Sequence, residues 1–530
     1  CVELKGKILS ETFGRKSALV SGAQSADAEL LLLPDELLLM VLQHLGAPDL
    51  LACRRVCRKL WRLALDPLLW QHQVLDDRAS WAGAVLRLAP CLHSLTVCWT
   101  SRLCHGENTV KTACAIESLS ITVCRAADFK RACSVIRNQA ALGRLRHVSL
   151  TFEFWDSPFQ DLPLYKDALS SLVQTLASAP GLLELEVRTL EGSSRVWCLE
   201  GHDRLEQITP RVPEPLAGSV APSLRRFVCR EQSFRAIGLE QAVLSAHAAT
   251  LEEVNIRTDA VAETSSLLAR IPHLRKLTCS LVPRMEQLAN CSKLTDVKLC
   301  VPPKRISASL IASVEAFLIE ARHLRALTLE FEDYDRKSSK DLAKIIAQVA
   351  GRSRLESLAM LEDVSVFDCY YYCYTSDSSD SEDCVSVSWN TEIGFETAPL
   401  FQPLLQAVRL LSHLRRLEVS RMPEELLEGI TPVTAPRLRT LVVTELSGST
   451  CLHSVLHQPG VMELLKANPQ LHLDVSLQNC EFPCSIDCMW CTQQCHTIVP
   501  IGARVGFFTH VPTDKCTIPE HNSCDQFSCP

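Results

Sequence analysis

The chain has 530 residues, a formal net charge of −7 and 47% hydrophobic residues, while aromatic residues make up only 6%. This length fits several ordinary domains or one repeat array. Because 61 acidic residues outnumber 54 basic ones, the overall charge does not indicate nucleic-acid binding. No apolar run reaches the roughly 18–20 residues that span a bilayer, so we expect no membrane partner.

Residues 1–29 are polar and small, which is typical of a disordered leader. A helix is predicted to start at Pro34, because Asp35 and Glu36 favour the positive end of a helix and Gly46 is a stop signal. Its apolar positions form a wide stripe: Leu37, Leu38, Val41, Leu42 and Leu45.

Two further helical pieces follow, one opening at Pro48 and one spanning roughly 54–65. The second has apolar residues on one side and mostly basic residues on the other. Asp66 and Pro67 end it, and the apolar Leu68–Trp70 comes next. Some forty residues with this much apolar surface cannot bury all of it internally, so part of the surface is expected to contact another protein or a neighbouring domain.

The stretch 33–70 resembles an F-box, and we assign residues 30–75 to it. The family pattern is matched in order by Leu33, Pro34, Glu36, Leu37, Leu38, Leu45, Asp49, Leu50, Val56, Cys57, Asp66, Pro67, Leu69 and Trp70. One position departs, since Leu60 stands where the family usually has Trp and Trp61 is displaced by one residue. An ordinary helical hairpin inside a larger fold is the alternative interpretation.

The resemblance implies that this segment docks on a Skp-type adaptor and, through it, joins cullin and RING subunits. The implied adaptor-facing candidates are Leu33, Pro34, Leu37, Val41, Leu45, Leu50, Val56, Cys57 and Trp70. Some of these residues must instead hold the helices together, and the sequence does not divide the two groups.

Residues 85–479 repeat a short pattern, Leu-x-x-Leu-x-Leu with conservative replacements, and the segments between copies often have helical periodicity. Copies occur at 92–97, 116–121, 145–150, 182–187, 251–256, 274–279, 294–299, 324–329, 355–360, 414–419 and 438–443, with a weaker copy at 224–229. A strand and a helix repeated in this way are typical of leucine-rich repeats.

The chain therefore resembles leucine-rich repeat proteins, although the Asn or Cys that usually follows the pattern is mostly absent. The resemblance implies an α/β fold: a short helical F-box followed by a curved solenoid, or horseshoe, with a parallel inner sheet. An α-solenoid is the alternative. Alternation along the strands predicts inner-face positions for a protein substrate: Glu186, Arg188, Asn255, Arg257, Lys298, Thr328, Glu330, Glu418 and Thr444.

Insertions near 191–222 and 361–399 interrupt the repeat. The second contains seven acidic residues between Glu362 and Asp383 and no basic one, which is typical of a solvated loop. Four serines lie among these acids and are candidates for phosphorylation, which would add about −1.5 to −2 charges per site. They are Ser376, Ser378, Ser379 and Ser381.

Residues 480–530 form a Cys-rich tail of unknown structure. The pair Cys488 and Cys491 has the spacing of a zinc knuckle, but the second well-spaced pair that a structural zinc site needs is missing. Disulfide bonds or an artefact of gene modelling remain as alternatives. We therefore assign no metal, no cofactor and no catalytic residue, since no phosphate loop, zinc-protease or serine-hydrolase motif occurs either.

Together the two resemblances imply a non-catalytic substrate receptor of a cullin-RING ubiquitin ligase. The other cysteines lack a disulfide framework, which favours a reducing compartment and hence the cytoplasm, the nucleus or both. One alternative is a secreted or cell-surface leucine-rich repeat protein whose Cys-rich tail caps the array. Another is an intracellular scaffold that uses an F-box outside any ligase.

Overall fold

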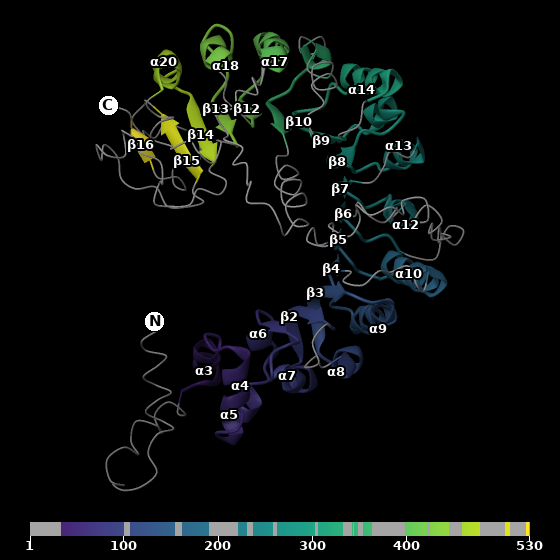
Figure 1. The fold of residues 1–530 in the computed structure, drawn as a ribbon. Helices are drawn as coiled ribbons and strands as arrows, with labels where there is room; N and C mark the ends of the chain where they lie inside the picture. Colours follow the sequence, from purple (N-terminus) through teal and green to yellow (C-terminus); the bar gives the residue numbers. More distant parts are fainter. Residues whose placement is uncertain are drawn as a thin grey trace, which may run out of the picture. The chain divides into compact units, whose positions relative to one another are not determined.

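The computed structural model describes residues 33–99, 106–153, 162–189, 221–230, 237–257, 262–302, 306–331, 342, 344–347, 353–362, 398–420, 424–444, 458–476, 504–508 and 526–528 (Figure 1). The chain divides into two compact units, one formed by 1–122 with 134–148 and the other by 123–133 with 149–530. Both combine helices with strands that pair mainly in parallel and in chain order. The fold is thus mixed α/β.

The first unit starts with four short helices: α3 (Asp35–Leu42), α4 (Ala47–Cys53), α5 (Arg58–Leu63) and α6 (Pro67–Trp70). The first helix begins at Asp35, one residue after the predicted start, and Pro34 is its N-cap. The third helix was predicted to begin near Arg54, which is wrong, because residues 54–56 form a turn and Cys57 is an extended N-cap. The Cys57 sulfur accepts the Leu60 N–H at 3.5 Å, so the helix begins only at Arg58.

A small parallel sheet follows in the same unit. It contains β1 (Val74–Asp76), β2 (Cys91–Cys98) and β3 (Ala115–Val123), with α7 (Ala82–Leu88) and α8 (Gly106–Lys111) in the connections. The helix α9 (Ala126–Leu142) and the strand β4 (His147–Phe152) lie across the division between the units. Gln139 of α9 is fully buried, and its side-chain amide pairs with the backbone at the start of β3: it accepts the Ile116 N–H at 2.9 Å and donates to the Cys114 carbonyl at 3.1 Å.

The second unit alternates strands and helices. Its strands are β5 (Glu184–Thr189), β6 (Arg226–Arg230), β7 (Glu253–Ile256), β8 (Lys276–Ser280), β9 (Asp296–Val301), β10 (Ala326–Phe331), β11 (Ser357–Glu362), β12 (Arg416–Val419), β13 (Thr440–Val443) and β14 (His472–Ser476). Its helices include α10 (Leu162–Ala177), α12 (Ile237–His247), α13 (Ala262–Leu268), the 3-10 helix η3 (Met285–Asn290), α14 (Ala308–Glu320), α17 (Ala398–Leu410), α18 (Glu424–Gly429) and α20 (Pro459–Ala467).

The repeated leucine pattern forms the core of this unit. Neighbouring strands from β5 to β14 pair in parallel, so equivalent pattern positions lie side by side, as with Leu277, Val297 and Leu327. The second and third apolar positions of a copy lie on the strand and are buried, and the first is buried in the turn before it, as Leu324 shows. Stacked copies therefore close one another's apolar edges, which a single copy cannot do.

Polar side chains connect the turns of successive copies. The Thr250 hydroxyl donates to the Leu224 carbonyl at 2.7 Å, and the Asn468 amide donates to the Ile430 carbonyl at 3.1 Å. His247 is buried at the end of α12, where its Nδ1 accepts the Ser223 N–H at 3.3 Å. These bonds satisfy backbone groups that would otherwise be buried without a partner.

Two strands come from the segment assigned to the Cys-rich tail. The strand β15 (Arg504–Phe508) pairs with β14 in antiparallel fashion, and β16 (Gln526–Ser528) pairs with β15 in parallel. The cysteines of the tail lie outside the described residues, as do the leader 1–29, most of both insertions and the four candidate serines. The zinc, disulfide and phosphorylation hypotheses thus stay untested predictions.

Candidate functional site

Helix α3 carries two apolar stripes, and its own unit covers only one of them. Leu38 and Leu42 are buried in the first unit. By contrast, Leu37 is 44%, Met40 60% and Val41 48% exposed. Because residues three and four apart share a helix face, these three side chains form one exposed surface, here called the α3 face.

Near the start of α5 lie two more exposed apolar side chains, Val56 and Trp61, which are 67% and 52% exposed. The guanidinium of Arg54 lies over the Trp61 ring, 5.0 Å from its centroid. This contact is within the range of a cation–π interaction. The Trp displaced by one residue in the sequence is therefore a surface residue, whereas Leu60 is half-buried.

Ion pairs connect the N-terminal end of α3 to α5. Asp35 forms ion pairs with Lys59 at 3.3 Å and with Arg62 at 2.6 Å, and the Lys59 ammonium also donates to the Leu33 carbonyl at 2.7 Å. Exposed pairs of this kind contribute only about 0–1 kcal/mol each. Together they connect the start of α3 to α5 within the domain.

Two of the predicted adaptor-facing residues are in the interior. Leu50 and Trp70 are both fully buried, and the Trp70 indole donates to the Ala64 carbonyl at 2.8 Å. A buried indole N–H needs such a partner. These two side chains hold the helices together, so they are not available to another protein in this conformation.

The structure separates the remaining candidates by exposure. Pro34, Leu37, Val41 and Val56 are exposed, whereas Leu33, Leu45 and Cys57 are half-buried. Sequence reasoning missed the exposed residues Met40, Trp61 and Leu68. For Met40, the spacing of three from Leu37 was the available signal.

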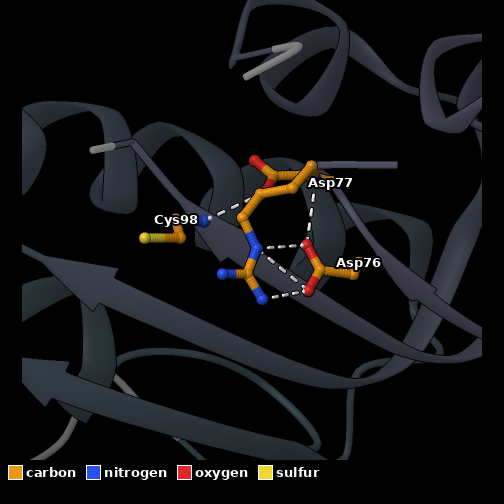
Figure 2. A network of polar contacts seen from close by, with 4 residues as sticks. Asp76, Asp77 and Cys98 are labelled. Carbon is orange, nitrogen blue, oxygen red and sulfur yellow. Dashed lines mark hydrogen bonds and ion pairs between the residues drawn. The ribbon is translucent and has the colours of Figure 1, made fainter. Parts of the chain in front are cut away.

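Polar contacts surround the first strand of the small sheet, and one of them joins it to the helical segment. The Gln73 amide donates to the Leu45 carbonyl at 3.0 Å. Just after β1, the fully buried Asp77 accepts the Cys98 N–H at 3.2 Å (Figure 2). The Arg78 guanidinium donates hydrogen bonds to the Asp76 carboxylate (Figure 2), the shortest at 2.6 Å. This hydrogen bonding lowers the pKa of Asp76. The helical segment thus continues directly into the strands.

The predicted inner-face residues are spread along the second unit. The structure brings three of them together: Glu330 of β10 pairs with Arg257 at 2.5 Å and with Lys298 at 2.6 Å. Glu186 pairs with Arg188 within β5 at 2.6 Å. The others lie elsewhere on the strands or just after them: Asn255 on β7, Thr328 on β10, Glu418 on β12 paired with Arg416, and Thr444 after β13.

Two buried thiols of the described residues, Cys114 and Cys291, are not activated. Burial raises the pKa of Cys114 to about 12 and that of Cys291 to about 11, so both stay protonated at neutral pH. In the described part of the chain, no group of three or more His, Cys, Asp or Glu side chains is placed to hold a metal ion. Among those residues, no helix is both long enough and apolar enough to cross a membrane.

Comparisons with known proteins identify the helical segment. Residues 30–76 match the F-box-like family. The chain is also similar to mouse F-box only protein 27, with 38% identity over 97 residues, which covers 16% of this chain and 34% of the mouse protein. The match therefore spans about a third of that relative. Residues 30–76 are an F-box-like domain, and the resemblance found in the sequence is confirmed for this segment.

Among solved structures, the chain is similar to the crystal structure of the Rad7 and Elc1 complex in yeast. The identity is 14% and the TM-score 0.32, with 92% of this chain and 95% of the other covered. At this TM-score the likeness is too weak to support a conclusion about fold or partners.

Proposed function

We propose that this chain, which carries an F-box-like domain at residues 30–76, is the substrate-recognition subunit of a cullin-RING ubiquitin ligase. In this proposal the α3 face and Trp61 contact a Skp-type adaptor, which connects the chain to cullin and RING subunits. The strands of the second unit, as a leucine-rich repeat solenoid, bind the protein to be modified. The chain itself makes and breaks no covalent bond and works in the cytoplasm, the nucleus or both.

The observation that carries the proposal is the α3 face. Its three apolar side chains are about half exposed or more, although the fold already has a buried stripe on the same helix. Exposed apolar clusters of this kind are typical of protein interfaces. Exposed basic residues of the same domain, including Arg55 and Arg58, would favour a partner with an acidic rim.

The mechanism follows from two binding sites on one chain. An adaptor on the α3 face and a substrate on the strands are held together, which raises the effective concentration of substrate lysines near the ligase's conjugating enzyme. Within the first unit, the hydrogen bond from Gln73, the residue before β1, to the Leu45 carbonyl in the helical segment supports a fixed link at the adaptor end.

Co-purification tests the proposal. The full chain should capture a Skp-type adaptor, and Leu37→Asp with Val41→Asp should abolish capture while leaving the melting temperature nearly unchanged. Val433→Asp is the matched control, since Val433 is an apolar side chain outside this domain and is 89% exposed. The proposal is wrong if the wild-type chain captures no adaptor, or if the double variant captures as much adaptor as the wild type.

A further inference from the structure

Three arginines stand side by side at the ends of neighbouring strands in the second unit. Arg188 of β5 and Arg230 of β6 are register partners, and the pairing of Cys229 with Ile256 puts Arg257 next in line. The Arg257 N–H continues the ladder by donating to the Cys229 carbonyl at 3.2 Å. We call Arg188, Arg230 and Arg257 the arginine row.

Placing three positive charges on adjacent strands has an electrostatic cost. Neighbouring strands lie about 4.8 Å apart, and like charges on adjacent strands repel each other. The core around β6 does not need Arg230, because the strand already buries Phe227, Val228 and Cys229. Arg230 is exposed at the end of this strand.

Among the residues that the structure describes, carboxylates pair with the two outer members of the row and not with the central one. Glu186 pairs with Arg188 at 2.6 Å, while Glu330 is shared by Arg257 and Lys298. Arg188, Arg257 and Lys298 thus pair with these two carboxylates, and neither carboxylate pairs with Arg230. Arg230, the central member, is exposed and has no ion pair with any other residue that the structure describes.

The geometry fits oxyanions on an extended peptide. A guanidinium presents a planar fork of donors that matches a carboxylate or a phosphate. The row is about 10 Å long from end to end, being two strand spacings. Side chains on one face of an extended peptide repeat about every 6.6–6.8 Å, so two acidic groups at alternate positions would both reach it.

We propose that the arginine row binds a peptide segment carrying carboxylate or phosphate groups at alternate positions. This deepens the proposed function and rests on it, in that the segment would belong to the substrate protein. Arg230 is the central contact, and Arg188 and Arg257 are held in place by Glu186 and Glu330.

Fluorescence anisotropy on the purified full chain, without adaptor, tests this surface. The probes are a labelled peptide of alternating glutamate and glycine, the same peptide with phosphoserine in place of glutamate, and a glutamine version. We expect at least one anionic peptide to bind, more weakly as salt is added, and the glutamine version not to bind. The comparison of the two anionic peptides shows which oxyanion is preferred.

Variants identify the residues. Arg230→Gln should weaken binding about tenfold through loss of a charge-assisted hydrogen bond, and Arg230→Lys should retain part of the affinity. Arg275→Gln is the matched control, because Arg275 is also exposed but precedes β8 at the opposite end of the strands. This variant should bind like the wild type. If Arg230→Gln and Arg275→Gln weaken peptide binding equally, the peptide is attracted only by the overall positive charge of the surface, and the proposal is wrong.

The same preparations separate this proposal from the previous one. If the chain captures adaptor but binds neither anionic peptide below about 1 mM, a very weak affinity, the arginine row is not a binding site and the ligase proposal stands. If it binds an anionic peptide but captures no adaptor, the row is supported as a peptide site and the ligase proposal fails.

Discussion

The guanidinium of Arg54 lies 5.0 Å from the centroid of the Trp61 ring, on the outside of the F-box-like domain. Only nine residues further along, Trp70 is fully buried and donates its indole N–H to the Ala64 carbonyl at 2.8 Å. The two tryptophans of one short segment therefore have opposite roles, one at the surface and one in the core.

Replacing Trp61 by alanine tests the surface role. We expect adaptor affinity to fall about tenfold, since exposed aromatic anchors often dominate interfaces, while the free energy of unfolding changes by less than about 1 kcal/mol because the contact with Arg54 is worth only ~0.5–1 kcal/mol. Titration calorimetry and urea unfolding measure the two quantities. Loss of stability without loss of affinity would assign Trp61 to the fold instead.

Replacing Trp70 by alanine should have the reverse signature. Removal of a fully buried Trp leaves a cavity and costs about 3–5 kcal/mol, and the Ala64 carbonyl also loses its donor. Much of the first unit should then unfold, which protease digestion followed by mass spectrometry would detect. A variant as resistant to protease as the wild type would contradict this prediction.

The side-chain amide of Gln139 makes the hydrogen bonds to the start of β3 that a neighbouring strand would otherwise make. Gln139→Leu leaves the Ile116 N–H and the Cys114 carbonyl without these partners, so we expect a loss of about 2–3 kcal/mol from buried unsatisfied groups. Leu142→Ala on the same helix is the control, because Leu142 is 39% exposed and its loss should cost less. Denaturant unfolding compares them, and equal costs would argue against a special role for Gln139.

His247 makes the second unit sensitive to acid. Burial lowers the pKa of His247 below its ordinary value of 6.5, although a hydrogen bond to the Ala177 backbone acts in the opposite direction. As the pH falls, the unfolded chain takes up the proton first, so the free energy of unfolding should decrease below pH 6.5. The decrease should level off once the pH is below the folded-state pKa of this imidazole.

The histidine prediction is checked by urea unfolding at several pH values. His247→Gln should show a shallower decrease than the wild type, whereas His44→Gln, at an exposed position, should follow the wild type. If the wild type and His247→Gln lose stability in parallel as the pH is lowered, the acid sensitivity comes from other groups.

The repeats show how far local patterns reach. Every copy of the Leu-x-x-Leu-x-Leu pattern ends in a strand, from β2 at 92–97 to β13 at 438–443, because alternation along a strand is a local property of the chain. The strands β14, β15 and β16 were not predicted. They follow a weaker pattern, and their pairing depends on segments far away in the chain, such as Leu473 beside Phe507.

The sequence by itself determined the F-box-like segment and the alternation that makes the core of the repeats. Both depend on local spacings of apolar residues, three and four apart in the helices and two apart in the strands. Only the tertiary structure decided which apolar residues face outward, since that depends on how α5 and α6 dock on α3 and not on the helices alone. The same holds for charge: Glu330 reaches Arg257, 73 positions away in the chain, and Arg188, Arg230 and Arg257 become neighbours only through strand register. Contacts of this range arise from packing, which no local pattern specifies.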